Sequence, residues 1–188
     1  MSCHNCNGLK DEEVISLIKH ESKTELFQVL YDKYQAKVAD KCYSILKDKI
    51  KAREFMQDIF SKVYEKLDSF RGTSSFSSWL YAVTYNHCIE YLRTKKKLHY
   101  PQWNQNSMLP EIIDEHEEDF TELKYERLLK VIDIIHPEEK VLLLMKYKDN
   151  LSLKLIQSTL KISESAAKMR LKRARARVMY LYNQLYKD

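Results

Sequence analysis

Glycine and proline are scarce in this sequence, with 2 and 3 copies in 188 residues. Strands joined by tight turns rely on these residues, so an all-β fold is disfavoured and long helices are favoured. With only Gly8 and Gly72 present, the chain has neither a phosphate-binding P-loop nor a glycine-rich dinucleotide-binding motif. The histidines are scattered and show no pairing with serine or cysteine. We therefore expect a protein that is not an enzyme and that uses no cofactor.

Long apolar runs and a disulfide framework are also lacking. No stretch approaches the about 18 consecutive apolar residues that span a bilayer, so we expect no membrane insertion. The first residues are polar, without the apolar stretch of a signal peptide, which predicts a cytoplasmic protein with reduced thiols. Cys42 and Cys88 lie in apolar stretches and are expected in the core. The segment Cys3-His4-Asn5-Cys6 supplies too few ligands for a structural zinc, so no metal site is expected.

Charge is distributed unevenly along the chain, although the net charge is only +5. Seven acidic residues and no lysine or arginine lie between Glu111 and Glu122. Six basic residues and no acidic ones lie between Lys168 and Arg177. The acidic run, preceded by Pro101 and Pro110, marks a linker that is too long for a loop inside one compact domain. We expect an N-terminal extension over 1–23, a first domain over 24–98, a linker over 99–120 and a second domain over 121–188.

Hydrophobic spacing predicts helices on both sides of the linker. Before the linker, helices are expected over residues 11–20, from 24 onward, over 50–67 and from 76 to about 97. Thr24 is a candidate N-cap for the second of these helices, and Ser74 or Ser75 for the fourth. The polar stretch between the third and fourth helices contains Gly72 and is expected to be a loop.

After the linker, the pattern predicts a helix-turn-helix at the end of the chain. Helices are expected over residues 123–135, 137–148, 153–160 and from 163 onward. Ser152 and Ser163 are candidate N-caps for the last two helices, which are joined by a turn at Lys161. The last helix carries an apolar stripe at alternating spacings of four and three: Ala167, Leu171, Ala174, Val178, Leu181 and Leu185.

The side of the last helix away from this stripe is basic. A short helix, a tight turn and a longer helix with exposed cations near its start is the geometry that enters a DNA major groove. There, lysine and arginine neutralise phosphates or read guanine edges. Helix-turn-helix shapes also occur in structural bundles, so a solvated basic face on a packing helix is the alternative interpretation.

The stretch over residues 70–80, FRGTSSFSSWL, is the most distinctive of the first domain. It is expected to form an aromatic-lined loop that leads into a helix with a basic end. Exposed aromatic rings stack on unpaired bases, and neighbouring cations hold the nucleic-acid backbone. The alternative is that Phe70, Phe76 and Trp79 are core residues, since aromatic side chains usually serve packing.

Two sets of motifs together resemble the extracytoplasmic-function (ECF) sigma factors of bacterial RNA polymerase, which belong to the sigma-70 family. AREFMQDIF at 52–60 and KLDSFRGTSSFSSWL at 66–80, followed by Asn86 and YLR at 91–93, are similar to that family's region 2. Residues 151–175 are similar to its region 4. The motifs occur in the family's order and are separated by a linker, which makes the combination far more specific than either part.

The resemblance implies an all-α protein with two small helical domains, which are a region 2 bundle and a region 4 helix-turn-helix. The implied partners are the RNA polymerase core and promoter DNA, and many family members are also held by an anti-sigma factor. Region 4 would read the minus-thirty-five element, with Arg170, Arg175 and Arg177 better suited to phosphates or packing. Its implied DNA-binding residues are Ser165, Lys168, Met169, Arg170, Lys172, Arg173 and Arg175.

Region 2 would have two roles. Its loop and following helix would capture a flipped base of the minus-ten element and hold the adjacent DNA. The residues implied for this are Asp68, Ser69, Phe70, Arg71, Ser74, Ser75, Trp79, Asn86, Arg93, Lys95, Lys96 and Lys97. Its third helix would dock on the clamp-helix coiled coil of the largest polymerase subunit through Glu54, Gln57, Asp58 and Ser61.

Three positions depart from the family's pattern. Lys161 stands where glycine is usual in the turn, Leu155 replaces an acid, so no capping box forms, and Lys172 replaces an apolar or aromatic residue. Two other functions remain open from the residues alone. One is a stand-alone helix-turn-helix regulator, which would bind specific DNA tightly without polymerase. The other is a protein-interaction module, which would make no salt-dependent DNA contact.

Overall fold

A computed structural model of the protein describes residues 9–21, 23–95 and 123–186. Within these ranges every regular element is a helix, which confirms the all-α prediction. The chain divides into two compact units, Met1–Tyr91 and Leu92–Asp188. The expected linker over 99–120 lies outside the described residues, and the domain boundaries stay predictions. No helix in the described ranges is both long enough and apolar enough to cross a membrane.

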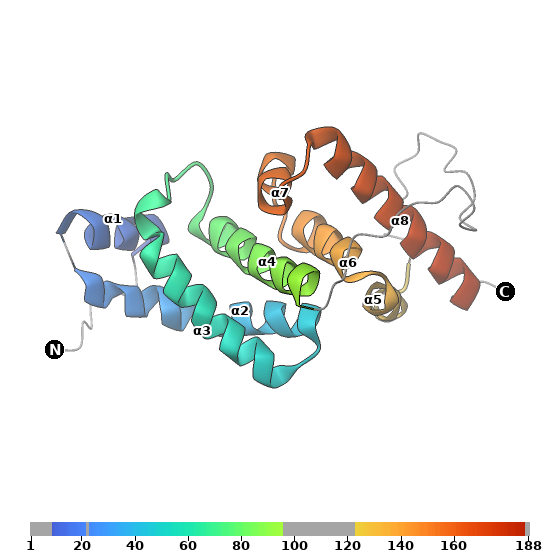
Figure 1. The fold of residues 1–188 in the computed structure, drawn as a ribbon, viewed down its shortest axis with the longest axis horizontal. Coiled ribbons are helices and arrows are strands. Elements are labelled where there is room, and N and C mark those ends of the chain that lie inside the picture. The colour runs from blue at the N-terminus through green and yellow to red at the C-terminus, as the bar shows by residue number, and fades with distance from the viewer. Residues whose placement is uncertain (1–8, 22, 96–122, 187–188) are drawn as a thin grey trace. The chain divides into compact units, whose positions relative to one another are not determined.

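The chain up to residue 94 forms a small helical bundle (Figure 1). Its elements are α1 Asp11–Glu21, the 3₁₀ turn η1 Thr24–Leu26, α2 Phe27–Leu46, α3 Lys49–Glu65, the 3₁₀ turn η2 Leu67–Ser69 and α4 Phe76–Thr94. The predicted loop lies between η2 and α4. The predicted cap at Thr24 is wrong, because Thr24 begins η1 and α2 starts at Phe27 without a side-chain cap.

Local chemistry explains the sharp corner between α2 and α3. Lys47 adopts a left-handed conformation with φ 55° and ends α2. Asp48 then caps α3, since its Oδ1 accepts hydrogen bonds from the N–H groups of Ile50 and Lys51, both at 3.0 Å. An N-capping carboxylate satisfies two helix donors that would otherwise lack partners. The antiparallel pair α2 and α3 packs closely as a result.

The core of the first unit is apolar and contains a pair of thiols. Leu30 and Val38 of α2, Ile59 of α3 and Leu80 of α4 are all fully buried. Cys42 and Cys88 are buried as predicted, and their Sγ atoms lie 3.8 Å apart. The hydrogen bond to Cys42, together with burial, raises the pKa of the Cys88 thiol well above its usual range. Both residues therefore behave as small core residues.

The second unit ends in the predicted helix-turn-helix. Its elements are α5 Tyr125–Ile134, α6 Pro137–Leu143, the π-helical turn η4 Leu144–Lys148, α7 Leu153–Leu160 and α8 Glu164–Tyr186. His136 Nδ1 caps α6 by accepting from the Glu138 N–H at 3.3 Å, and Pro137 occupies the first turn. Asn150 has φ 50°, as expected for the residue that ends this helical segment.

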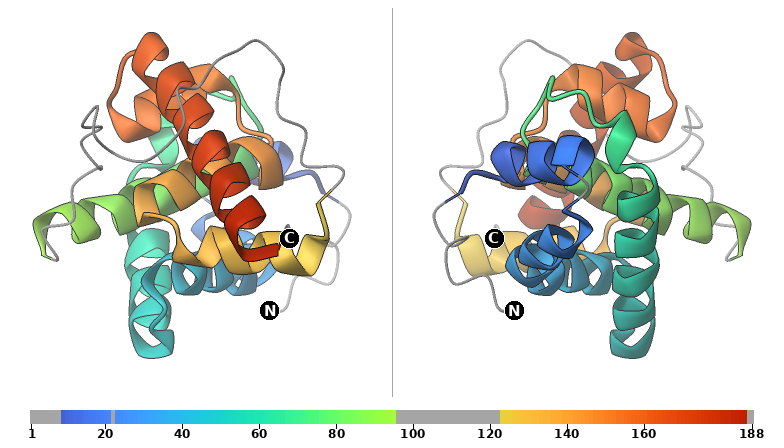
Figure 2. Two further views of the ribbon diagram at one scale, coloured as in Figure 1. Left: turned by 90° about the vertical axis from the view of Figure 1, so that its right-hand side faces the viewer. Right: turned by 90° about the vertical axis from the view of Figure 1, so that its left-hand side faces the viewer.

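Helix α8 lies across α5 and α6 and supplies much of this unit's core (Figure 2). Ala167, Leu171, Ala174 and Val178 are buried as predicted. The prediction is wrong at the C-terminal end of the stripe: Leu185 is 53% exposed, and Tyr182 is buried instead. A strict alternation of four and three drifts around a helix of 3.6 residues per turn, so the buried stripe moves by one residue near the end.

Candidate nucleic-acid interface

The helix-turn-helix is fixed by caps at the start of both of its helices. Ser152 Oγ accepts from the Leu155 N–H at 3.2 Å, and Ser163 Oγ accepts from the Ala166 N–H at 3.2 Å. Between them, Lys161 adopts the left-handed conformation with φ 55° and ψ 47°. The turn therefore keeps its shape without glycine, at a cost of about 1 kcal/mol for a residue with a Cβ.

The buried stripe of α8 determines which of its side chains face outward. Ser165, Lys168 and Met169 lie on the exposed face near the start of the helix, and Met169 is 48% exposed. Lys172 and Arg173, one turn later, are half-buried. Lys168 forms an ion pair with Glu164 at 2.6 Å, but both side chains are more than half exposed. Such a surface pair is worth little and leaves the ammonium available to a phosphate.

Three arginines of α8 are engaged inside the unit. Arg177 Nε donates to Glu139 Oε1 at 3.1 Å, and Arg170 Nη1 lies 3.6 Å from Glu138 Oε2. Both glutamates follow Pro137 in the first turn of α6 and are buried. These contacts tie the middle of α8 to α6, which orients the exposed basic face. Arg175 is also engaged, since its Nη1 donates to the Tyr147 hydroxyl at 3.0 Å.

In the first unit, the loop between η2 and α4 is anchored by aromatic packing. The ring of Phe70 is only 8% exposed and packs on Phe76 and Trp79, with ring centroids 5.9 and 5.4 Å away. The structure thus places Phe70 and Phe76 in the core, while Trp79 is half-buried. Gly72 supplies the left-handed residue of the loop, with φ 70°.

The polar side chains of this loop are exposed. Asp68, Ser69, Arg71 and Ser75 are exposed, and Ser74 is half-buried. Ser75 caps α4 as predicted, because its Oγ accepts from the Ser78 N–H at 3.3 Å. The loop therefore presents hydroxyl, carboxylate and guanidinium groups beside the start of a helix, a set that can hydrogen-bond to base edges and phosphates.

The remaining residues predicted for DNA lie along α4 and beyond it. Asn86 and Arg93 are half-buried on α4, and Lys95 is exposed directly after the helix. Lys96 and Lys97 lie outside the described residues. Within the described part, Arg93 and Lys95 place positive charge at the end of α4, and the polar groups of the loop lie at its start.

The four residues predicted to bind polymerase share one exposed face of α3. Glu54, Gln57, Asp58 and Ser61 are all exposed. Asp58 lies 4.0 Å from His87 Nε2 of α4, and the ammonium of Lys62 lies 2.8 Å from His87 Nδ1. Burial, followed by the nearby Lys62, lowers the pKa of His87, so the ring is neutral at pH 7. The face itself is acidic and rich in hydrogen-bonding groups.

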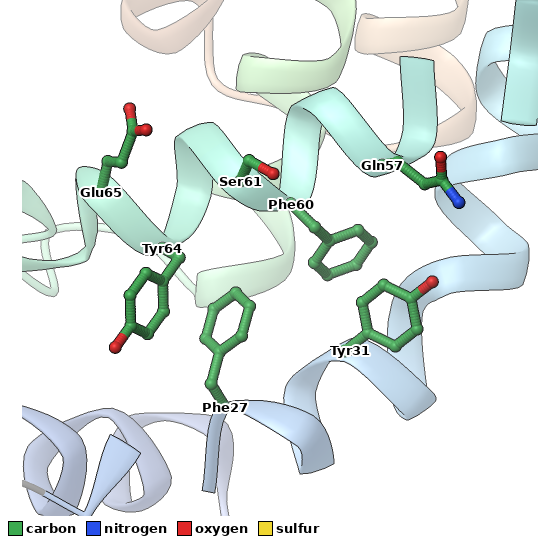
Figure 3. Close-up of a pocket in the computed structure, with 7 residues that line it drawn as sticks. All are labelled: Phe27, Tyr31, Gln57, Phe60, Ser61, Tyr64 and Glu65. Atoms are coloured by element: carbon green, nitrogen blue, oxygen red, sulfur yellow. The ribbon is translucent and has the colours of Figure 1, made fainter. Parts of the chain in front are cut away.

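An aromatic groove that the sequence reasoning missed lies between α2 and α3, beside this face (Figure 3). Its volume is about 430 Å³, and its aromatic lining comes from Phe27 and Tyr31 of α2 and Phe60 and Tyr64 of α3. The rings meet edge to face, with centroids 5.0 Å apart for Phe27 and Tyr64. Each helix carries its two rings at a spacing of four, which is the signal in the sequence. The polar side of the lining is Gln57, Ser61 and Glu65.

No cluster of metal-ligating side chains is present in residues 9–21, 23–95 and 123–186. The chemistry that the described residues offer is recognition: exposed cations on α8, polar groups on the loop before α4, and an acidic face on α3. The exposed cations of α8 and the polar groups of the loop before α4 are suited to a polymer that carries negative charge or hydrogen-bonding edges, whereas the α3 face is suited to a basic partner.

The chain is similar in sequence to several known proteins. The Sigma-70 region 2 family matches residues 30–98. The ECF RNA polymerase sigma factor SigW of Bacillus subtilis is 28% identical over 165 residues, which cover 80% of this chain and 86% of the relative. Other curated sigma factors match over 74–84 residues, which is 38–43% of their own length.

The fold of the chain is similar to that of several solved structures. CnrH, solved in complex with the cytosolic domain of CnrY, has a TM-score of 0.60 and 16% identity, covering 93% of this chain and 97% of that one. The sigma factor RpoE of Bartonella quintana, solved with the anti-sigma factor NepR, has a TM-score of 0.56 and 17% identity, covering 82% of this chain and 95% of that one. These similarities show that the arrangement of helices is shared.

Proposed function

We propose that this chain is an ECF sigma factor of the sigma-70 family and that its residues divide the work of starting transcription as follows. It binds core RNA polymerase, recognises the minus-ten and minus-thirty-five promoter elements and opens the DNA. The observation that carries this proposal is the presence, in one chain, of a polar loop at the start of α4 and a capped helix-turn-helix with an exposed basic face.

The second unit reads the minus-thirty-five element. Ser165, Lys168 and Met169 enter the major groove first because they lie near the start of α8, and Lys172 and Arg173 follow one turn later. Arg170 is engaged with buried Glu138 and Arg175 with Tyr147, so these two serve mainly to hold α8. This division leaves base reading to the other five side chains.

The loop before α4 captures a flipped base of the minus-ten element. Extruding a base costs a few kcal/mol, which stacking and hydrogen bonds to the base edge offset. Asp68, Ser69, Arg71 and the serines of the loop supply those bonds, and half-buried Trp79 supplies a ring. Phe70 acts through packing, because its ring is buried and fixes the loop from beneath. Asn86 and Arg93 on α4 and Lys95 directly after it hold the adjacent strand, and Lys96 and Lys97, which follow in the sequence, are assigned to the same contact.

The exposed face of α3 docks on the clamp-helix coiled coil of the largest polymerase subunit. Glu54 and Asp58 give this face negative charge that complements a basic partner, while Gln57 and Ser61 offer hydrogen bonds. The protein acts in the cytoplasm, has no catalytic site and uses no cofactor. An anti-sigma factor is a further partner, supported by the complex of the fold relative from Bartonella quintana with NepR.

The test is run-off transcription on a library of random promoters, with purified bacterial core polymerase and with or without this protein. We expect transcripts only when the protein is added, and the enriched sequences give its promoter. If no transcript starts while the protein alone retains particular DNA sequences, the proposal is wrong and a stand-alone regulator is the better account.

A paired set of variants separates promoter reading from polymerase binding. Lys168→Ala/Arg173→Ala removes two cations from the start of α8 and is expected to abolish promoter use while core binding is kept. Lys124→Ala/Lys130→Ala removes the same charge from exposed positions of the α5 segment and serves as the matched control. Unchanged transcription from the first pair would show that α8 is not the recognition helix.

A further inference from the structure

Helix α1 forms hydrogen bonds to both ends of the loop that precedes α4, although it lies about 50 residues earlier in the chain. Lys19 Nζ donates to the main-chain oxygens of Phe70 at 2.8 Å and Asp68 at 3.1 Å. At the other end, Glu12 Oε1 accepts from the Phe76 N–H at 3.3 Å. Figure 1 shows α1 beside the end of α3, where this loop begins. Helix α1 therefore forms hydrogen bonds at both ends of this loop.

These hydrogen bonds go to backbone C=O and N–H groups at helix ends, where the helix itself provides no partner. Asp68 and Phe70 lie at the end of the 3₁₀ turn η2, where the last carbonyl groups lack helical partners, and an ammonium is a favourable ligand for them. Phe76 is the first residue of α4, where N–H groups lack partners and a carboxylate is favoured. Charge-assisted hydrogen bonds of this kind are roughly twice as strong as neutral ones.

Helix α1 is itself firmly placed, so it can act as a support. Val14, Ile15 and Ile18 are buried against the rest of the unit. At the start of the helix, Asp11 accepts hydrogen bonds from the Tyr34 hydroxyl at 2.5 Å and from the Lys33 ammonium at 2.6 Å. The support is therefore linked to α2 as well as to the loop.

We propose that α1 is a strut that holds the loop over residues 68–75 in the shape that captures a base, with Lys19 and Glu12 as positioning residues. This inference rests on the proposed function of the loop in minus-ten recognition. Gly72 lies between the two anchored ends, and its left-handed conformation gives the loop a sharp turn. A loop held at both ends loses less conformational entropy when it binds, which raises affinity without a new contact to the DNA.

The experiment measures binding of polymerase holoenzyme to labelled single-stranded DNA that carries the minus-ten sequence enriched in the transcription library. Lys19→Met keeps the length of the side chain but removes the ammonium, and we expect binding about tenfold weaker, equivalent to about 1.4 kcal/mol. Lys19→Arg is expected to restore most of the affinity. Glu12→Ala, at an exposed position, tests the other anchor and is expected to weaken binding in the same direction.

Lys10→Met is the matched control, because it removes one cation from an exposed position just before α1. It is expected to leave DNA binding unchanged. Affinity for core polymerase, measured in parallel, is expected to stay the same for all variants and shows that they fold.

Salt dependence separates a strut from a direct DNA contact. A positioning role leaves the slope of log affinity against log salt unchanged, whereas loss of a phosphate contact lowers it by about one. A lowered slope for Lys19→Met would overturn the proposal, and so would unchanged affinity. If wild-type holoenzyme itself fails to bind this DNA, the proposed function of the loop is wrong, and the strut proposal falls with it.

Discussion

The buried pair of Arg177 and Glu139 provides a demanding test of how α8 is held. Arg177 is 28% exposed and Glu139 is fully buried, and the guanidinium Nε lies 3.1 Å from the carboxylate. Hydrogen-bond geometry is met at Oε1, whereas Oε2 lies 3.1 Å from the same nitrogen without meeting that geometry. Burial raises the pKa of Glu139, and Arg177 counters this only in part. The carboxylate is therefore held in an environment that disfavours its charge.

Arg177→Met removes the compensating charge while keeping most of the side-chain volume. Breaking a buried ion pair by deleting one partner costs about 3–5 kcal/mol, because an uncompensated charge is left in the interior. Some solvent reaches Arg177, so we expect the lower end, about 3 kcal/mol at pH 7. The measurement is urea-induced unfolding followed by far-UV circular dichroism.

The pH dependence of this loss has a definite sign. Because the folded-state pKa of Glu139 is raised, the folded protein binds more protons than the unfolded chain between the two pKa values, so stability falls as the pH rises through that window. In Arg177→Met the pKa of Glu139 rises further, so the loss of stability relative to the wild type is expected to be smaller at pH 5 than at pH 7. A deficit that is equal at both values would refute the assignment to a buried charge.

Two further variants serve as controls for this prediction. Arg177→Met/Glu139→Met removes both charges and is expected to recover most of the lost stability, as seen when buried pairs are replaced by apolar residues. Lys168→Met removes a cation from the same helix, but its pair with Glu164 is exposed, so the expected cost is below about 0.5 kcal/mol. Equal costs for Arg177→Met and Lys168→Met would contradict the reasoning from burial.

Three other predictions follow from the described contacts. Gly72→Ala is expected to destabilise the protein by about 1 kcal/mol in thermal unfolding. Its φ is 70° and the space around an added Cβ is open, so backbone strain is the only cost. If the variant loses no stability, the turn changes shape freely. Ser163→Ala removes the cap of α8 and is expected to cost about 1 kcal/mol and to weaken minus-thirty-five binding, whereas Ser163→Asn should retain both. Burial lowers the pKa of His87, so the stability that the neutral ring contributes is present above about pH 6.5 and is lost as the pH falls below that value. In urea unfolding measured at a series of pH values, His87→Gln should make this loss of stability smaller. An unchanged loss would exclude His87 as its cause.

Local signals in the sequence predicted much of the fold. Ser75, Ser152 and Ser163 each precede an apolar periodic stretch, and each caps the helix expected there. Capping depends on neighbours within three residues, so it can be read without tertiary information. The position of the helix-turn-helix and the burial of Cys42 follow in the same way from local patterns.

Contacts between distant residues could not be read in this way. Glu138 and Glu139 look like ordinary solvated acids at the start of a helix, and only the packing of α8 shows that they are buried beside arginines. The bonds of Lys19 to the loop join residues 49 and 51 positions apart. The sequence contains all of these side chains, but their pairing depends on how the helices pack, and periodicity carries no information about that.

The two thiols in the core of the first unit have a practical consequence. Cys42 and Cys88 are 0% exposed, so a thiol-reactive reagent can modify them only when the helices that surround them separate. The rate at which they become labelled therefore reports how often this unit opens. The protein carries a native probe of its own opening, and labelling in the presence and absence of polymerase would show how far binding suppresses that motion.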